Sequence, residues 1–454
     1  MKPKLKPRVR VSPPGPCSLA ALDQLHSTIG RGNYMGLYGI TIAGCRDLFL
    51  TDVDGNVYLD CISGAASTNI GYDCHSVAEA YYETSLAFPH TCFSYSPSQV
   101  VMELAATLLR ITPGDYSKKV LFSLSGSRAF ENALEVMWQY TGRRKIIVFE
   151  HAYHGATWLA QWVSGFRGHR LEEFYHQMFL PLPYPGAPSS SQPILASMEK
   201  LLATGEVAGV VIEPIQGDAG VVCPPDRFFT SLAALLKKYN VVLAVDEIQN
   251  GMGRTGQWWS IEHYGVVPDL IIMGKALAGG YAPVSALVGR AEIIDSMEPG
   301  KQIGTFIGHP PSSAAALETI RVIEENGLLD HVTRMGEHLI QGLGKIQQRF
   351  PTLVRAVRGK GLLLGLEIDI ENDGNLGKYF AMACVEKGLY IGFYGVRQNV
   401  LRISPPLTIQ MEEADFIIKT IREVAQSFLQ TGIPERIREK VERFAIGLAM
   451  TCPG

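Results

Sequence analysis

The stretch LIIMGKALAGGYAPVSALVG (270–289) decides the fold of this chain and indicates its chemistry. It places one lysine, Lys275, directly after an apolar run of the kind that forms a buried strand, and before a series of small residues. An amine in that position is poorly solvated, and poor solvation favours its neutral, nucleophilic form. We therefore predict that Lys275 is a nucleophile at the end of a strand.

A second apolar run, VVLAVDEIQNGMGRTG (241–256), carries Asp246 at the end of another buried strand. A carboxylate there requires a cationic or hydrogen-bonding partner. Pyridoxal 5'-phosphate needs an amine for its aldehyde and an anion beside its pyridine nitrogen, which keeps the ring able to accept electrons. Lys275 and Asp246 together therefore predict a site for this cofactor. Gln249 is either a contact to the phenolic oxygen of the ring or a solvated turn residue.

Hydrogen-bond donors for the cofactor phosphate are expected where SLSGSRAFENAL (123–134) passes from a strand into a helix. Ser125, Gly126 and Ser127 begin that helix, and the unpaired backbone N–H groups of a helix start bind anions. The same turn also fits an ordinary helix cap, so its interpretation as an anion site depends on the presence of Lys275.

Further candidate residues follow other apolar runs. Tyr153, in AYHG, is a flat group for the face of the cofactor ring, unless it packs in the core. We interpret His154 as a hydrogen-bonded loop histidine. Glu213 and Asp218, in EPIQGDAG, close another strand and either face a polar pocket or cap the next helix. Arg402, in NVLRISPPLTI, needs an anionic partner, which is either a substrate carboxylate or a structural carboxylate.

Composition limits the class of protein. The chain has 454 residues, enough for a two-domain enzyme. Hydrophobic residues make up 46% and charged residues 19%, as in ordinary globular proteins. A net charge of −3 argues against nucleic acid or a membrane as partner and favours small-molecule substrates. The eight cysteines show no zinc, redox or disulfide spacing, which favours a cytoplasmic location.

The order of the periodic segments predicts an α/β fold with two domains. Residues 1–35 are expected to be an N-terminal arm, solvated over its basic, proline-rich start, with a nucleic-acid contact as the alternative. Residues 76–325 alternate helical periods with short apolar runs, which predicts a large domain of parallel strands flanked by helices. Residues 36–75 and 326–454 are expected to form a smaller α+β domain. The Pro- and Ser-rich stretch 182–194 is interpreted as a loop, either a surface excursion or a pocket wall.

Taken together, these motifs resemble those of the class III pyridoxal-phosphate aminotransferases over about residues 36–430. SGSRAFENAL resembles the family's phosphate-binding turn, AYHG its ring-stacking segment, EPIQGDAG its substrate-side loop, VDEIQNGMGRTG its pyridine-binding strand and IIMGKALAGG its Schiff-base segment; GTFIGHPPSSAAAL and NVLRISPPLTI fit as well. The resemblance implies the fold type I architecture, with a mostly parallel sheet in the large domain and a smaller α+β domain built from both chain ends.

The resemblance also implies how the cofactor is held. Lys275 forms an aldimine with it, Asp246 pairs with the pyridine nitrogen, Gln249 approaches the ring oxygen and Tyr153 stacks on the ring. Gly126 and Ser127, with Ser125 beside them, hold the phosphate. In the family the threonine of the TFxGHP segment reaches the phosphate across a dimer interface. Thr305 therefore implies a homodimer with shared active sites.

Transamination is the favoured reaction of the alternatives that the resemblance leaves open. Lys275 takes the Cα proton of an amino-acid substrate and passes it to the cofactor, which releases a keto acid and calls for a keto-acid acceptor. Arg402 is implied to bind the substrate α-carboxylate, and Glu213 to pair with Arg402 when a different substrate end is bound. Gln249 and the GHP segment also suit this reaction.

Racemisation or epimerisation is the close alternative. Asp218 stands where many aminotransferases carry glutamate, and APVSA (282–286) also looks like the racemase branch of the family. Asp218 then protonates Cα from the face opposite Lys275. Carbon–carbon bond formation is the least favoured reaction and is motivated only by Arg128, a cation where the family usually has an acidic residue.

Overall fold

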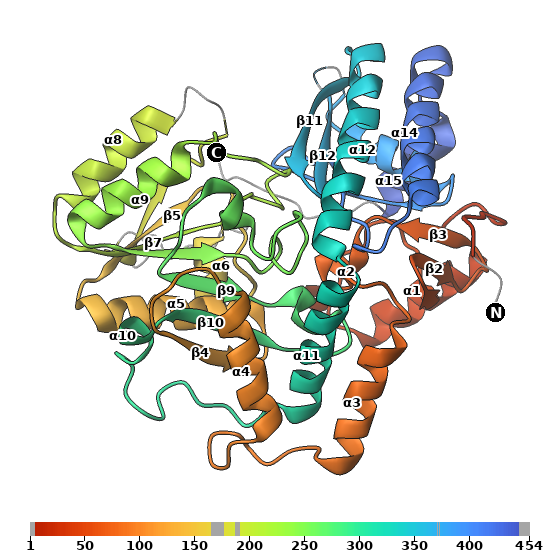
Figure 1. Cartoon of the computed structure of the whole chain (residues 1–454). Coiled ribbons are helices and arrows are strands. Elements are labelled where there is room, and N and C mark those ends of the chain that lie inside the picture. Colours follow the sequence, from red (N-terminus) through yellow and green to blue (C-terminus); the bar gives the residue numbers. More distant parts are fainter. Residues whose placement is uncertain (1–4, 165–176, 187–190, 370, 372, 445–454) are drawn as a thin grey trace. The chain divides into compact units, whose positions relative to one another are not determined.

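The structure of the chain is a computed structural model that describes residues 5–164, 177–186, 191–369, 371 and 373–444 (Figure 1). The described residues form two compact units. The large unit runs from His75 to Leu329, and the small unit comprises the residues up to Cys74 together with those from Asp330 onward. Each unit has its own sheets and its own buried core.

A seven-stranded sheet with the order β4-β10-β9-β8-β7-β5-β6 forms the centre of the large unit. The strands are β4 (Lys118–Ser123), β5 (Lys145–Phe149), β6 (Phe179–Leu182), β7 (Val207–Ile212), β8 (Val242–Asp246), β9 (Leu270–Met273) and β10 (Ser285–Arg290). Neighbouring strands from β9 to β6 are parallel, and the sheet is therefore mostly parallel, as the sequence predicts.

One strand departs from the predicted parallel arrangement. β10 is antiparallel to both of its neighbours, β9 and β4, so the prediction of parallel strands is wrong for this segment. The connection from β9 to β10, residues 274–284, is too short for the crossover that a parallel pair requires. An apolar run indicates that a strand is buried, but it does not indicate the direction of that strand.

Helices cover both faces of this sheet (Figure 1). The chain passes from β4 through β5 to β6 in one direction across the sheet and returns through β7 and β8 to β9 in the other. Right-handed crossovers therefore place α5 and α6 on one face and α8 and α9 on the other. The helices are α3 (His75–Ala87), α4 (Gln99–Ile111), α5 (Gly126–Thr141), α6 (Trp158–Val163), α8 (Ser191–Leu202), α9 (Phe228–Tyr239), α10 (Ala291–Ile294) and α11 (Pro310–Glu325), with short 3-10 turns at Ser260–Tyr264 and Lys275–Ala278.

The core of the large unit lies between α5 and the sheet. Phe130, Leu134 and Met137 recur at helical spacing on α5 and are fully buried, packed with strand residues such as Val148 and Val211. The stretch 182–194 is only partly a loop, because α8 begins at Ser191.

Two four-stranded sheets, β1-β2-β3-β13 and β11-β12-β15-β14, form the small unit. The strands are β1 (Ile42–Arg46), β2 (Phe49–Asp52), β3 (Val57–Asp60), β11 (Val354–Lys360), β12 (Leu363–Ile368), β13 (Leu389–Tyr390), β14 (Gly392–Tyr394) and β15 (Val400–Ile403). The helices are α1 (Pro16–Thr28), α2 (Ser63–Ala66), α12 (Leu328–Arg349), which begins at the boundary of the units, α13 (Leu376–Val385), α14 (Met411–Thr431) and α15 (Glu435–Phe444).

The N-terminal segment contacts the rest of the small unit. Arg8 and Val57 exchange two backbone hydrogen bonds, of 2.8 and 2.9 Å. Asp54 accepts the backbone N–H groups of Cys17 and Ser18 at the start of α1. The residues predicted to be a solvated arm therefore pack on the small unit, apart from residues 1–4, which lie outside the described residues.

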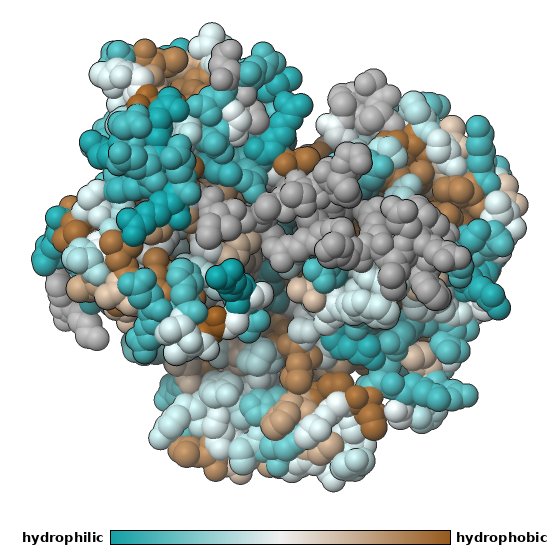
Figure 2. Space-filling view, turned by 180° about the vertical axis from the view of Figure 1, so that it is seen from behind, coloured by the Kyte–Doolittle hydropathy of each residue, from teal (hydrophilic) through white to brown (hydrophobic). Residues whose placement is uncertain are grey.

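The surface mixes residue types. Figure 2 shows apolar residues exposed among hydrophilic ones on one face of the molecule. Across the described part of the chain, no helix combines the length and the apolar composition needed to cross a bilayer.

Candidate active site

A cavity of about 200 Å³ lies at the carboxyl ends of the parallel strands of the large unit. Its lining residues follow β4, β5, β7, β8 and β9, strands that share one direction and therefore end at one edge of the sheet. This edge is where α/β sheets bind their ligands. The lining residues are Gly126, Ser127, Tyr153, His154, Gly155, Ala156, Glu213, Asp218, Asp246, Ile248, Gln249 and Lys275.

Asp246 is the last residue of β8 and is buried. Its Oδ1 accepts the backbone N–H of Ile248 at 3.0 Å, and its Oδ2 lies 2.7 Å from Nδ1 of His154. His154 is buried too, and its ring stacks on Phe130 with the two centroids 4.4 Å apart. The carboxylate therefore has a fixed orientation and a buried hydrogen-bonding partner, as its position requires.

Lys275 follows β9 and begins a 3-10 turn. Its φ of 42° lies in the left-handed region, which residues other than glycine rarely adopt and which recurs at functional sites. A Cβ on the preceding Gly274 would lie 3.4 Å from Cα of Gly126, so the backbone before the lysine packs directly against the start of α5. The lysine and the proposed phosphate site are therefore neighbours.

The start of α5 meets the loop that follows β5. Ser127 Oγ accepts the backbone N–H of Ala156 at 3.2 Å. A Cβ on Gly155 would lie 2.0 Å from that same Oγ, so a larger residue has no room there. Gly126 and Ser127, the first two residues of α5, line the cavity, and backbone N–H groups at a helix start have no intrahelical acceptor, which is the arrangement that binds phosphate.

Glu213 joins two loops of the cavity. Its Oε1 accepts the backbone N–H of Tyr153 at 2.9 Å, and its Oε2 accepts the backbone N–H of Gly217 at 3.2 Å. Burial raises the pKa of this carboxyl well above its usual range, and the negative charges of Asp246 and Asp218 act in the same direction. Glu213 therefore fixes the backbone of Tyr153, whose side chain lines the cavity.

Asp218 lies in the loop after β7 and is 8% exposed. Its Oδ1 accepts a hydrogen bond from Nε2 of Gln249 at 3.3 Å. A Cβ on Gly217 would lie 1.6 Å from Oε1 of Gln249, so the amide side chain packs on the turn that carries the aspartate. The contact of Gln249 with a ring oxygen stays a prediction.

Three residues predicted for the site are outside the lining of this cavity. Ser125 is the N-cap of α5, where its Oγ accepts the N–H of Arg128 at 3.3 Å. Thr305 is an exposed residue of the large unit. Arg402 is buried in β15 of the small unit, and its guanidinium lies 3.6 Å from the ring centroid of Tyr394. The roles of Thr305 and Arg402 stay predictions.

Sequence reasoning misses four of the lining residues, which are His154, Gly155, Ala156 and Ile248. His154 is hydrogen-bonded, as expected, but its partner is the strand-end aspartate, which lies 92 residues further along the chain. Ile248 follows Asp246 closely and lies against the start of α5, since a Cβ on Gly126 would be 2.8 Å from its Cδ1. The sequence VDEI (245–248) places this apolar residue two positions after Asp246, and that spacing could have identified Ile248 as a lining residue.

The comparison with known families agrees with this geometry. The model of the family "Aminotransferase class-III" matches residues 34–425, which is most of the chain. The chain belongs to the class III aminotransferase family. It is therefore an enzyme of this family, whose members depend on pyridoxal phosphate and act on amino acids.

This member of the family is similar in sequence to relatives with two kinds of activity. An alanine/serine racemase from Pyrococcus horikoshii is 35% identical over 460 aligned residues, which cover 96% of this chain and 94% of the relative. A leucine/methionine racemase from Thermococcus litoralis is 36% identical, with 80% of this chain and 85% of the relative covered. A 4-aminobutyrate aminotransferase from Mycobacterium leprae is 34% identical, with 88% and 93% covered.

The fold of the class III family is also found among solved structures. An ornithine aminotransferase from Toxoplasma gondii matches with a TM-score of 0.81 at 26% identity, covering 91% of this chain and 96% of that structure.

The cavity residues fit the cofactor of the class III family. Lys275 offers the amine and Asp246 the anion, and both line one cavity with the start of α5. Gly126 and Gly155 line the same cavity, and neither has room for a Cβ, because Ile248 and Ser127 pack where it would lie. Nε2 of His154 is buried without a hydrogen-bonding partner among the described residues. This nitrogen is therefore available to bind a ligand or a water molecule.

Proposed function

We propose that this enzyme is a pyridoxal-phosphate-dependent amino-acid racemase or epimerase in which Lys275 and Asp218 are the two groups that exchange protons with Cα. The observation that carries this proposal is the position of the two residues in one cavity. Lys275 follows β9 and Asp218 follows β7, and β8, which ends in Asp246, lies between these strands. Inversion requires such a pair on either side of the reacting carbon.

Each residue has a separate task in this proposal. The cofactor, when bound, supplies the electron sink that allows the Cα–H bond to break. Asp246, held by His154, would pair with the pyridine nitrogen. Lys275 would hold the cofactor by its aldehyde and would take the Cα proton of the substrate. Asp218 delivers a proton to the other face of Cα, and the product leaves with the opposite configuration.

Other residues bind and orient. We assign the phosphate to Gly126 and Ser127, with Ser125 capping the helix that holds them. We assign the ring face to Tyr153 and the ring oxygen to Gln249. We assign Thr305 to the phosphate and Arg402 to the substrate carboxylate. Glu213 either pairs with Arg402 or only fixes the backbone of Tyr153 and Gly217.

Transamination is the second candidate. The 34% identity with a 4-aminobutyrate aminotransferase over 88% of this chain supports it. It requires Lys275 as the sole proton carrier, together with a keto-acid acceptor, and leaves Asp218 a binding role. Arg128 no longer supports carbon–carbon bond formation, because its guanidinium pairs with Glu131 and Glu135 of its own helix at 3.3 and 3.0 Å.

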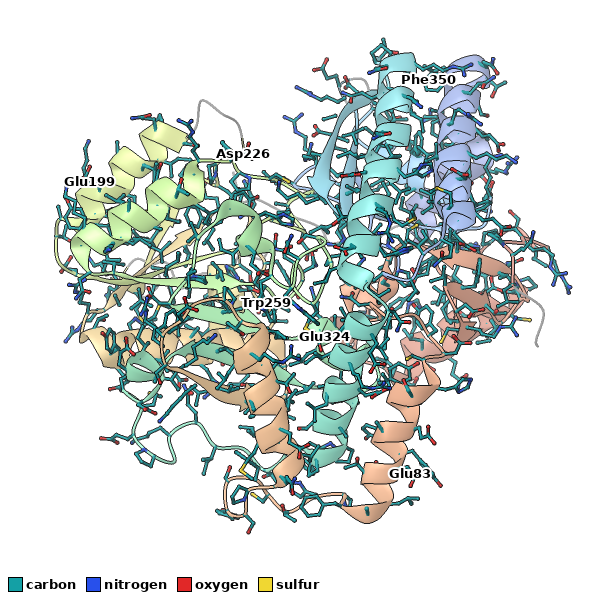
Figure 3. The ribbon with its side chains drawn as sticks, viewed as in Figure 1. Glu83, Glu199, Asp226, Trp259, Glu324 and Phe350 are labelled. Atoms are coloured by element: carbon teal, nitrogen blue, oxygen red, sulfur yellow. The ribbon has the colours of Figure 1, made fainter. Side chains whose placement is uncertain are left out.

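The test uses cofactor-loaded protein and one L-amino acid, alanine or leucine, without a keto acid. We expect the D-isomer to accumulate. Strict dependence on added keto acid, with no D-isomer, would instead establish transamination. Lys275→Ala should abolish both reactions, and Asp218→Asn should abolish inversion. Asp226→Asn, which alters an exposed aspartate before α9 (Figure 3), is the matched control and should keep full activity.

We further propose a homodimer with shared active sites. Large apolar side chains are exposed on α3, on α4 and just before α11, including Leu86, Met102, Ile303 and Phe306, which are 65%, 53%, 58% and 51% exposed. α3 and α4 both pack against α11, and His90, between them in sequence, stacks on Phe306 with centroids 4.7 Å apart. An apolar surface of this kind is typical of an interface.

We also propose a cytoplasmic location. Cys17 and Cys45 are exposed thiols that form no disulfide in the described structure. Unpaired exposed thiols persist in a reducing compartment.

A further inference from the structure

Asp218 lies in a short, closed hairpin. Gln216 and Val222 exchange two backbone hydrogen bonds, of 3.0 and 2.9 Å, across its base. Inside it, the N–H groups of Gly220 and Val221 both donate to the carbonyl of Gly217. Val221 is fully buried at a φ of 53°, a conformation that a β-branched residue adopts only when its surroundings enforce it. The hairpin therefore depends on neighbouring segments to keep its shape.

Tyr184 is one such neighbour, and it comes from the segment after β6. Its hydroxyl oxygen lies 2.9 Å from the carbonyl oxygen of Glu213 and 3.1 Å from that of Pro214, immediately before the hairpin, so its single O–H donates one hydrogen bond shared between them. Its ring meets Phe149 edge-on, with the centroids 5.8 Å apart. The hydroxyl thus hydrogen-bonds the backbone that leads into the Asp218 turn, where the Pro214 carbonyl also accepts from Tyr264 at 3.4 Å.

The same segment touches the far side of the hairpin. The backbone N–H of Gly186 donates to the carbonyl of Tyr184, which turns the chain back toward the hairpin. A Cβ on Gly186 would lie 2.9 Å from Cγ1 of Val222. Tyr184 therefore bonds the chain at the entry of the hairpin, and Gly186 packs against its exit. The sequence predicts either a surface loop or a pocket wall for the stretch 182–194. Its first residues pack behind the hairpin that carries Asp218, which lines the cavity.

We infer that Tyr184 is a positioning residue that holds Asp218 in the place from which it protonates Cα. The inference rests on the proposed racemase function. Tyr184 lies outside the lining of the cavity and acts through the backbone of Glu213 and Pro214. Proton transfer is sensitive to misplacement of the donor by about 1 Å. Removal of the Tyr184 hydroxyl should therefore slow inversion while proton abstraction by Lys275 continues.

The test compares two variants that each remove one hydroxyl. Tyr184→Phe keeps the ring against Phe149. Tyr116→Phe is the matched control, because the Tyr116 hydroxyl also donates to a carbonyl of the large unit, that of Pro268 at 2.7 Å, before the start of β9. In D2O, proton NMR follows the loss of the Cα–H signal, and chiral chromatography follows inversion.

We expect Tyr184→Phe to lower the inversion rate roughly tenfold and to keep Cα–H exchange within about twofold of wild type, in line with the loss of one buried hydrogen bond. Tyr116→Phe should change neither rate. Equal losses of exchange and inversion in Tyr184→Phe, or no loss of inversion, would overturn the inference.

A structural measurement on the cofactor-free protein is independent of turnover. Amide hydrogen exchange of a peptide spanning 213–222 should become roughly tenfold faster in Tyr184→Phe and stay unchanged in Tyr116→Phe. Unchanged protection in Tyr184→Phe would contradict the proposed support of the hairpin by the Tyr184 hydroxyl. If wild-type protein forms no D-isomer, the proposed function fails and this inference fails with it. If wild type inverts and Asp218→Asn does not, an unaffected Tyr184→Phe overturns this inference alone.

Discussion

The pair formed by Asp246 and His154 fixes the carboxylate that we propose as the partner of the pyridine nitrogen. Both side chains are buried, so each depends on the other for a hydrogen bond. We predict that His154→Phe, which keeps a flat ring beside Phe130, weakens cofactor binding by about tenfold or more, because the bond it removes is charge-assisted. Titration of cofactor-free protein with pyridoxal phosphate, followed by absorbance, measures the dissociation constant.

The control for this prediction is another histidine–aspartate pair. His338 and Asp415 lie 2.7 Å apart on the surface of the small unit. His338→Phe should leave the dissociation constant unchanged. If both variants bind the cofactor as tightly as wild type, the importance of His154 is refuted.

Glu247, next to Asp246, is a buried carboxyl that the proposed reaction does not use. Its Oε1 accepts the N–H of Ile261 at 2.7 Å, and burial raises its pKa from 4.5 to about 8. Between these two values the folded protein retains a proton that the unfolded chain has lost. Stability contributed in this way is complete below pH 4.5 and is lost as pH rises toward about 8. Glu213, whose pKa is also raised, acts with the same sign.

We therefore predict that the thermal unfolding temperature decreases as the pH is raised from 5 to 8. The decrease should be smaller in Glu247→Gln, whose side chain does not titrate. Glu83→Gln, on the exposed side of α3 (Figure 3), should follow the wild-type profile. Parallel profiles for wild type and Glu247→Gln would contradict the assigned proton. Scanning calorimetry or circular dichroism across this pH range provides the midpoints.

At the scale of elements, continuous apolar runs were sufficient to predict β7, β8 and β9, because strands buried on both faces contain few polar residues. The chemistry proposed for their carboxyl ends rests on Asp246 and Lys275 and stays a prediction. Strand direction and partners did not follow, as β10 illustrates. The contact of His154 with Asp246 joins loops from two strands that are not adjacent, and no local pattern encodes it.

The contact between α5 and the loop after β5 gives a prediction at this scale. A methyl group in Gly155→Ala would collide with Ser127 Oγ, and the φ of 129° is unfavourable for alanine. We expect the cofactor phosphate to bind at least about tenfold more weakly, because the first turn of α5 must shift. Gly205→Ala, with a φ of 74° and open space around it, separates backbone strain from crowding. Equal cofactor affinity in the two variants would contradict the crowding argument.

At the scale of the whole molecule, each unit closes its own core, and a group of large exposed apolar side chains lies on α3, on α4 and before α11. We predict that Ile303→Glu converts a dimer to a monomer, because a carboxylate in an apolar interface has no partner. Sedimentation velocity measures the mass. Val267→Glu, at an apolar side chain that is 47% exposed elsewhere in the large unit, should leave the mass unchanged. A monomeric wild type, or an unchanged Ile303→Glu, would refute the interface.

Thr305 lies between two of those exposed apolar residues, Ile303 and Phe306, and this position makes a shared site testable. Thr305→Glu places a negative charge where the phosphate is proposed to bind, so it should inactivate whichever site Thr305 serves. Lys275→Ala inactivates the site of its own chain. If Thr305 serves the partner, a mixed dimer of the two inactive variants combines both defects in one site and leaves the other site intact. Unfolding and refolding the two variants together should then restore activity that neither has alone. If activity stays absent while mixed dimers are present by mass spectrometry, Thr305 serves its own chain.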